Sequence, residues 1–392
     1  MKKSFTLVEI LIVLALISIL ATILIIILKP GEILKRSRDT QRIGDLNNLD
    51  KSIKFMVINE PNFQETTYAS SNIVYISLPD SSSTCDSWLN KLPSLPAGWS
   101  YRCSATPTNI DGTGWIPFPF SQNPLINISK LPIDPLNQPP YYYSFVVGGS
   151  YKLTAKPETN YNFAIDDGGI EPILYEVGTN KRLSTFQSGL VGYWPFDEGS
   201  GVIAYDLSGY GNNGTLQNGP QWVDGKLGKA LSFDGVDDHV NLGPRPMLDF
   251  LNNFTMCTWF NHISGSGILV NNEGKYEWAP NVNQPGKVSY AVANTSPGWN
   301  WVVSSNFSSG QWQFYCFTYS SNALIKSYIN GINNYVLQGS GNIDDFAPHL
   351  NDVRIGGRQS EVQFFNGLID EVRIYNRALS DDEIKALYEA TK

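Results

Sequence analysis

The sequence contains few of the residues that metal-dependent and nucleophilic enzymes use. Its 392 residues include only three histidines and four cysteines. The histidines, His239, His262 and His349, lie far apart without the spacing of metal ligands, and no two cysteines form a Cys-x-x-Cys pair. Gly-x-Ser-x-Gly elbows, phosphate loops and His-Glu metal motifs are also absent. These absences argue against zinc sites, serine hydrolases and nucleotide-hydrolysing enzymes.

Positive charge is also scarce, because the chain carries a net charge of −8. The acidic excess is greatest in the second half of the chain, which argues against nucleic acid as a ligand. An apolar content of 42% and an aromatic content of 12% are enough to build substantial cores and exclude wholesale disorder. The length favours two globular domains.

Residues 5–28 form a continuous apolar run in which Glu9 is the one ionisable residue. A helix of this length, rising about 1.5 Å per residue, spans the roughly 30 Å of a bilayer core. A carboxylate in such a helix costs about 2–3 kcal/mol unless a partner neutralises it. The run therefore predicts a transmembrane helix and a partner for Glu9. A signal peptide or a plain anchor is the alternative, although no small-residue cleavage site follows Leu28.

The first nine residues, MKKSFTLVE, resemble the class III leader of type IV pilins and type II secretion pseudopilins. The resemblance implies that a prepilin peptidase cleaves between Ser4 and Phe5, that the new amine of Phe5 is methylated, and that the helices assemble into a filament. It also implies that Glu9 pairs with the N-terminal amine of a neighbouring subunit. Ser4 departs from the glycine that this family usually has before the cut. We expect residues 1–4 to be a leader and the N-terminus to be cytoplasmic, with the helix in the inner membrane.

Residues 29–186 read as the rest of a pilin-like domain. Apolar residues recur every three or four positions over residues 29–60, which predicts one helix face: Ile43, Leu46, Leu49, Ile53 and Val57. Short strands are expected at 72–78, 141–147, 150–155 and 161–165, between clusters of turn-forming residues. In pilins the helix packs on such a small antiparallel sheet. Cys85 and Cys103 are expected to form a disulfide, because the segment is predicted to be exported.

A linker near residues 181–188 leads into a second domain, residues 187–392. Alternating strand patterns between turn clusters predict an all-β sandwich, followed by a short helix that Ser380 and Glu383 cap. The segments 189–216, 225–242 and 366–387 resemble, in order, the motifs of the laminin G-like, or concanavalin A-like, jelly roll. The whole chain is therefore expected to be α+β: a long helix with a small sheet, then the jelly roll.

The resemblance to the jelly-roll fold also implies two structural features. Cys257 and Cys316 fall in strands that neighbour each other in this fold, so a disulfide between them is plausible. Many members of the fold bind calcium, and Asp206 and Asp370 match recurring acidic positions. Turn formation and a surface strand position explain these two residues about as well. Oxygen ligands would suit Ca²⁺ rather than zinc or iron. The weaker calcium candidates are Asp197, Asn212 and Asp234.

Saccharide recognition would require exposed aromatic rings beside polar side chains, because sugars stack on rings and their hydroxyls need hydrogen-bond partners. Trp194, Trp259 and Trp312 lie in regular strand motifs and are expected to be core residues. Two aromatic pairs, each with the two-residue spacing of one strand face, are the candidates for a ligand-binding surface: Tyr276 with Trp278, and Trp299 with Trp301. Edge packing is the alternative for each of them.

The sequence favours a binding protein over an enzyme. A glycoside hydrolase needs two carboxylates that face one cleft. The nearest pairs, at 197–198, 237–238 and 370–371, are adjacent residues that point to opposite faces of a strand. We therefore expect a non-enzymatic, minor pilin-like subunit that displays a lectin-like domain for adhesion to glycans or surface proteins. The alternative is a type II secretion pseudopilin with a structural or protein-binding jelly roll.

Overall fold

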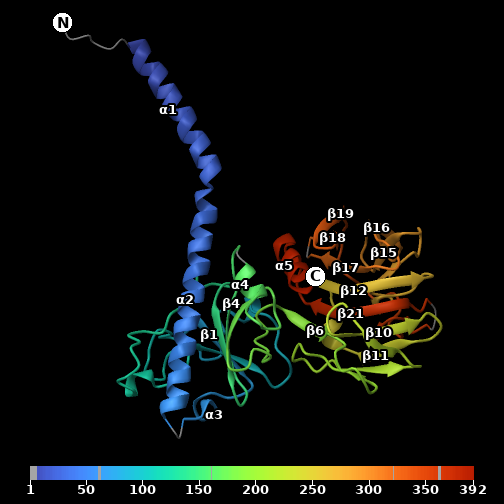
Figure 1. Ribbon diagram of the computed structural model, residues 1–392, viewed down its shortest axis with the longest axis horizontal. Helices are drawn as coiled ribbons and strands as arrows, with labels where there is room; N and C mark the ends of the chain where they lie inside the picture. The colour runs from blue at the N-terminus through green and yellow to red at the C-terminus, as the bar shows by residue number, and fades with distance from the viewer. Residues whose placement is uncertain (1–6, 61–62, 160, 321, 361–362) are drawn as a thin grey trace.

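The computed structural model describes residues 7–60, 63–159, 161–320, 322–360 and 363–392, with backbone alone for residues 21 and 23–28. Helix α1 (Leu7–Leu28) leads into α2 (Pro30–Asn59), and together they form the long rod in Figure 1. Lys29 separates the two helices with a φ of 42°, and Pro30 occupies the first turn of α2. Ser4 and Phe5 lie outside the described residues.

None of the helices within the described ranges is long and apolar enough to cross a membrane. The transmembrane span expected over residues 5–28 therefore stays a prediction.

Helix α2 lies against a five-stranded sheet, and the two form the small-sheet domain. The strand order is β2-β1-β3-β4-β5, with β1 and β2 parallel and the other neighbours antiparallel. The expected wholly antiparallel sheet is thus wrong at its β1–β2 edge. The strands are β1 (Ile73–Pro79), β2 (Ser100–Ser104), β3 (Tyr143–Val147), β4 (Tyr151–Ala155) and β5 (Tyr175–Gly178). Single helical turns form α3 (Glu65–Tyr68), η1 (Leu89–Lys91), η2 (Phe120–Gln122) and α4 (Asn162–Ile165), so the strand expected at 161–165 is wrong.

The apolar stripe of α2 packs on the sheet as its spacing predicts, except at its end. Leu46, Leu49 and Ile53 are each 1% exposed or less and join one hydrophobic cluster with strand residues of β3 and β4. Val57 is 38% exposed, and Met56 is buried in its place. The expected disulfide between Cys85 and Cys103 is present, with the two Cα atoms 5.2 Å apart.

A buried arginine joins α2 to two distant loops. The Arg42 guanidinium is 1% exposed and donates two hydrogen bonds to the Asp134 carboxylate, at 2.6 and 2.9 Å. It also donates to Asp39 on its own helix, at 2.7 Å, and to Glu158, at 2.8 Å. Asp134 further accepts the backbone N–H of Leu136, so its carboxylate holds the proline-rich loop against α2.

The rest of the chain forms two large antiparallel sheets packed face to face, which we call the sandwich domain. The first large sheet has the order β19-β18-β17-β12-β21-β10-β9, with β6 also paired to β21. Its strands are β6 (Leu190–Trp194), β9 (Gln221–Asp224), β10 (Lys229–Asp234), β12 (Phe254–Ser264), β17 (Trp312–Tyr319), β18 (Leu324–Ile329), β19 (Ile332–Gln338) and β21 (Asn366–Tyr375).

The second large sheet has the order β16-β15-β14-β13-β20-β11-β8-β7. Its strands are β7 (Ile203–Ala204), β8 (Gly214–Gln217), β11 (His239–Pro244), β13 (Val270–Asn272), β14 (Tyr276–Pro280), β15 (Lys287–Val292), β16 (Val302–Asn306) and β20 (Asp352–Ile355), with η3 (Pro246–Leu248) after β11. One continuous apolar core fills the space between the sheets and includes Trp194, which is 0% exposed. Helix α5 (Asp381–Thr391) ends the chain, capped by Ser380 and Glu383 as expected.

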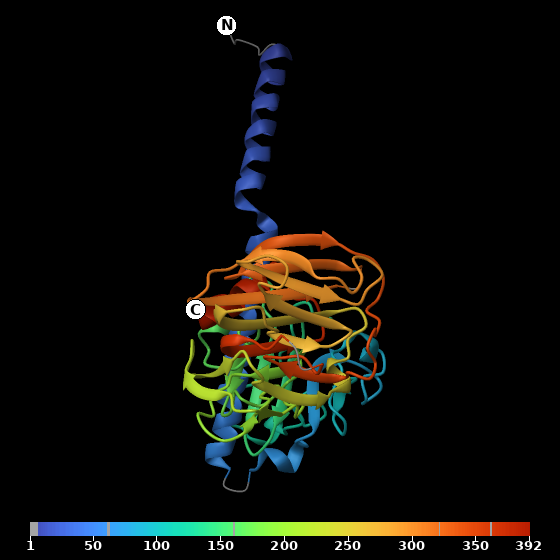
Figure 2. The same ribbon diagram turned by 90° about the vertical axis from the view of Figure 1, so that its right-hand side faces the viewer.

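The outer face of the first large sheet is covered by α5 and by the small-sheet domain. Cys257 and Cys316, which form the second expected disulfide, lie in this layer together with Trp259. Tyr161 and Ile173 of the small-sheet domain belong to the same apolar cluster. The second large sheet is consequently the layer farthest from the small-sheet domain, and the sandwich lies beside that domain rather than beyond the end of α2 (Figures 1 and 2).

The linker expected near residues 181–188 is partly buried, because Thr185 to Ser188 are all buried. Phe186 packs edge-on against Trp99 and Tyr210, and Gln187 hydrogen-bonds Thr154. The connection is therefore part of the contact between the domains.

Candidate ligand-binding face

Two of the four aromatic residues predicted to bind ligand are core residues. Tyr276 and Trp278 are each 1% exposed and pack in the cluster between the two large sheets. Strand β14 lies between β13 and β15, and both of these residues point to the inner side of its sheet. The expectation that they form an exposed surface is therefore wrong.

The residue between them points the other way, because successive side chains of a strand alternate between faces. On the outer face of the second large sheet, Glu277 pairs in register with Asn271, Asn271 with Arg354, and Arg354 with Asn241. We call these four residues, on four adjacent strands, the polar row. Ser289 on β15 lies on the same face, because its partner Ala279 is two residues beyond Glu277.

Most of the polar row is buried without a full set of hydrogen bonds. Asn271 and Ser289 are 0% exposed, Glu277 is 1% and Arg354 is 8% exposed. Among the described residues, the Asn271 amide, the Ser289 hydroxyl and Nε of Arg354 have no hydrogen-bond partner. The Asn271 amide lies beside the Glu277 carboxylate without reaching hydrogen-bond geometry. Buried polar atoms in folded proteins nearly always have partners, so these atoms need an explanation.

Arg358 covers the end of the polar row. Its guanidinium forms a two-pronged ion pair with Glu277, in which the Nε–Oε2 distance is 2.8 Å. It also lies over the Trp301 ring, with its central carbon 5.5 Å from the ring centroid. Burial raises the pKa of the Glu277 carboxyl, although the hydrogen bond from Arg358 lowers it. Trp301 is therefore placed beside the polar row, whereas Trp299 packs against the apolar core.

The two acidic residues predicted to bind calcium each accept hydrogen bonds from backbone N–H groups. The Asp206 carboxylate accepts hydrogen bonds from backbone N–H groups of Tyr193, Ser208 and Asn212, at 2.8–2.9 Å, so it holds a turn. Asp370 is 0% exposed, and its Oδ2 accepts the N–H groups of Lys226 and Leu227.

Burial also raises the pKa of Asp370 to about 8, which favours its neutral form at neutral pH. Neither residue belongs to a group of three potential metal ligands within the described ranges. In this structure the two carboxylates serve backbone hydrogen bonds, and a calcium site that includes Asp206 and Asp370 stays a prediction.

The weaker calcium candidates are also engaged in the fold. Asp197 accepts the N–H of Lys229, and the Asn212 amide donates to the carbonyl of Val191. Asp234 lies with Asp237 and Asp238 in an acidic cluster whose ligand atoms are within 4.8 Å of one another. Asp234 and Asp237 are exposed, and exposed acidic clusters are common without an ion.

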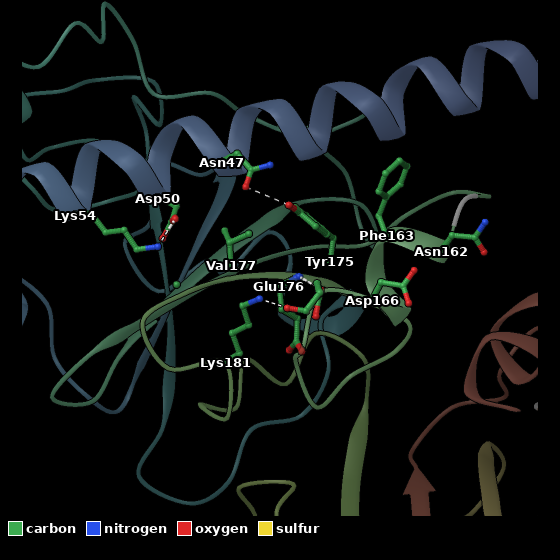
Figure 3. Close-up of a pocket in the computed structure, with 12 residues that line it drawn as sticks. Asn47, Asp50, Lys54, Asn162, Phe163, Asp166, Tyr175, Glu176, Val177 and Lys181 are labelled. Atoms are coloured by element: carbon green, nitrogen blue, oxygen red, sulfur yellow. Dashed lines mark hydrogen bonds and ion pairs between the residues drawn. The ribbon is translucent and has the colours of Figure 1, made fainter. Parts of the chain in front are cut away.

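The small-sheet domain has a separate open pocket of about 440 Å³ between α2 and β5 (Figure 3). Its polar lining is largely paired: Tyr175 donates to Asn47 at 3.2 Å, and Lys54 bonds Asp50 at 2.7 Å. The Asp167 carboxylate accepts the N–H of Gly169, and burial raises its pKa to about 7. Because the polar side chains that line it are largely paired with one another, the pocket is explained by the packing of the helix on the sheet.

Comparison with protein families finds matches for two parts of the chain. Residues 1–25 match the prokaryotic N-terminal methylation motif, and residues 234–385 match the concanavalin A-like lectin/glucanases superfamily. The chain thus joins a pilin-type N-terminal motif to a lectin-like domain of the laminin G type, as the two resemblances in the sequence predicted. No curated protein matches the chain significantly.

Solved structures resemble about half of this chain. Domain 4 of an extracellular arabinanase from Geobacillus stearothermophilus, solved with arabinotriose, is 20% identical with a TM-score of 0.41, covering 51% of this chain and 98% of that one. The binding domain of Paraclostridial Mosquitocidal Protein 1 is 19% identical with a TM-score of 0.41, covering 51% and 52%. The binding domain of botulinum neurotoxin serotype D is 15% identical with a TM-score of 0.40, covering 52% of each. Structural similarity at TM-scores this low says nothing about the ligand of this protein.

Proposed function

We propose that this protein is a non-enzymatic, minor type IV pilin-like subunit that displays a lectin-like domain at the cell surface for adhesion to saccharides. The observation that carries the proposal is the presence of a methylation motif and a lectin-like domain in one chain. A motif that directs filament assembly gives the attached domain a place outside the cell.

The N-terminal segment supplies the assembly part of this proposal. A prepilin peptidase cleaves between Ser4 and Phe5 and the Phe5 amine is methylated, after which residues 5–28 hold the subunit in the inner membrane and then in the filament. Glu9 pairs with the N-terminal amine of a neighbouring subunit, which offsets the cost of a carboxylate in an apolar helix. The chain crosses the membrane once with its N-terminus in the cytoplasm.

The size and position of the sandwich domain favour a minor subunit. The domain lies beside the small-sheet domain and not in line with the helix, so it adds width at every position it occupies (Figure 1). A domain of this size on every subunit would crowd a helical filament, whereas a few copies, or copies at the tip, fit. A type II secretion pseudopilin with a protein-binding sandwich is the second candidate, and a glycoside hydrolase is less favoured.

The adhesive part of the proposal is tested by saccharide binding. The full chain in detergent should bind at least one saccharide on a glycan array and in calorimetry. Each measurement is made with calcium and again with chelator. Loss of binding with chelator would show that binding requires a calcium ion. A folded protein that binds no saccharide under either condition would contradict adhesion to glycans and favour the protein-binding candidate.

A further inference from the structure

We propose that the polar row and Trp301 form the saccharide subsite of the sandwich domain, that its ligand is a neutral saccharide, and that the Arg358 side chain occupies the subsite until the ligand displaces it. This inference rests on the proposed function and adds to it the place and the ligand class. It concerns the outer face of the second large sheet, which points away from the small-sheet domain (Figures 1 and 2).

The unpartnered atoms of the polar row match what a sugar hydroxyl offers. A hydroxyl donates one hydrogen bond and accepts others, so neighbouring hydroxyls can serve an amide, a carboxylate and a guanidinium together. Within the described part of the chain, the amide of Asn271 and Nε of Arg354 are buried without hydrogen-bond partners, and these residues sit in register on adjacent strands. The rigid sheet holds the groups in place before a ligand arrives.

Arg358 combines the two contacts that a saccharide would make. It pairs with the Glu277 carboxylate and covers the Trp301 ring, and its side chain remains 16% exposed while that of Glu277 is 0% exposed. Rotation of this one flexible side chain uncovers a carboxylate for hydroxyl groups and a ring for stacking at the same time. The guanidinium thus takes the place of the ligand in the unbound protein.

The charges at the site favour a neutral ligand over an acidic one. Glu277 is paired with Arg358, and Arg354 has Asp352 at 3.8 Å, so each arginine already has a carboxylate. An acidic saccharide would place a second negative charge beside the uncovered Glu277 carboxylate, and like charges repel. A neutral saccharide satisfies Glu277 through its hydroxyls.

The test measures dissociation constants of the full chain in detergent for neutral and uronic-acid-containing oligosaccharides. Trp301→Ala should weaken binding of a neutral saccharide at least about tenfold, because large aromatic side chains are among the residues that dominate binding. Asn271→Ala should also weaken it. Arg358→Ala should strengthen it several-fold, because the competing state is removed.

Trp88→Ala is the matched control. Trp88 is also partly exposed and also has a cation over its ring, with Lys91 Nζ at 5.5 Å from the centroid, but it lies in the small-sheet domain. This variant should bind as the unchanged protein does. Circular dichroism confirms that each variant is folded.

The outcomes separate this inference from the proposed function. Saccharide binding that survives both Trp301→Ala and Asn271→Ala would overturn the subsite while leaving the adhesive function intact. Loss of binding in Arg358→Ala, with a preference for acidic oligosaccharides, would overturn the neutral ligand and the displaceable role of Arg358. Failure of the unchanged protein to bind any saccharide would overturn the proposed function and this inference with it.

Discussion

Replacing Arg42 with methionine is expected to lower the free energy of unfolding of the small-sheet domain by about 3–5 kcal/mol. Arg42 is buried and holds three carboxylates, those of Asp39, Asp134 and Glu158. Methionine fills part of the space but leaves these acidic groups without their shared cation. Removing one partner of a buried ion pair lowers the free energy of unfolding strongly, because a charge is left buried without its partner. Replacing the whole pair by apolar residues is often close to neutral.

The measurement is thermal and urea unfolding of the full chain, followed by circular dichroism. Arg36→Met is the control, because Arg36 lies on the same helix but is exposed, and it should change the free energy of unfolding by less than about 0.5 kcal/mol. Adding Asp134→Asn to Arg42→Met should recover part of the loss. Equal stability of the Arg42 and Arg36 variants would contradict the role of the buried network.

Replacing Glu383 with glutamine is expected to separate the two domains. Glu383 is 2% exposed, accepts two hydrogen bonds from Arg377, at 2.7 and 2.9 Å, and bonds Lys156 of the small-sheet domain at 2.7 Å. Arg377 in turn donates to the carbonyl of Ser188, at 2.6 Å. Glutamine leaves the buried Lys156 ammonium and the partly exposed Arg377 guanidinium without a counter-ion, at a cost of about 3–5 kcal/mol.

The expected result is a larger radius of gyration by small-angle scattering and faster proteolysis between residues 179 and 189. Glu389→Gln is the control, because Glu389 lies on the same helix, has its side chain 36% exposed and forms an ion pair with Lys392. An unchanged radius of gyration and unchanged proteolysis in Glu383→Gln would show that the apolar contacts alone hold the two domains together.

The same contact gives the domain interface a dependence on pH. Burial alone would raise the pKa of Glu383, but Arg377 and Lys156 hold it well below its usual value. Because the folded-state pKa is depressed, the stabilisation is present above the pKa of the unfolded chain and is lost as the pH falls toward the folded-state pKa. The unchanged protein should therefore begin to lose this interface in acid, and Glu383→Gln should lack that part of the acid dependence.

Local patterns predicted most elements of the fold. The spacing of Leu46, Leu49 and Ile53 identified the buried face of α2, and the Ser380–Glu383 capping box identified the start of α5. The buried ion pairs were not predictable from local patterns, because Arg42 and Asp134 are 92 residues apart in the chain. The same holds for Lys156 and Glu383, which the contact between the domains brings together.

The candidate site was predicted only in part. The two-residue spacing of Tyr276 and Trp278 placed both on one face of a strand, but spacing alone does not say whether that face meets the core or the solvent. Both residues face the core, and the informative residue was the one between them, Glu277. A glutamate between two large aromatic residues was the signal that could have indicated the polar outer face. Its partners Asn271 and Arg354 depend on strand pairing over long distances in the chain.

Display of the lectin-like domain on a filament is tested most directly by mass spectrometry of filaments sheared from cells. The protein is expected to be present as a minor component, to lack residues 1–4 and to carry one methyl group on Phe5. A Glu9→Ala variant should be cleaved equally well and be missing from the filaments. An uncleaved protein that stays in the membrane fraction would contradict display, and a protein that dominates the filaments would contradict the minor role.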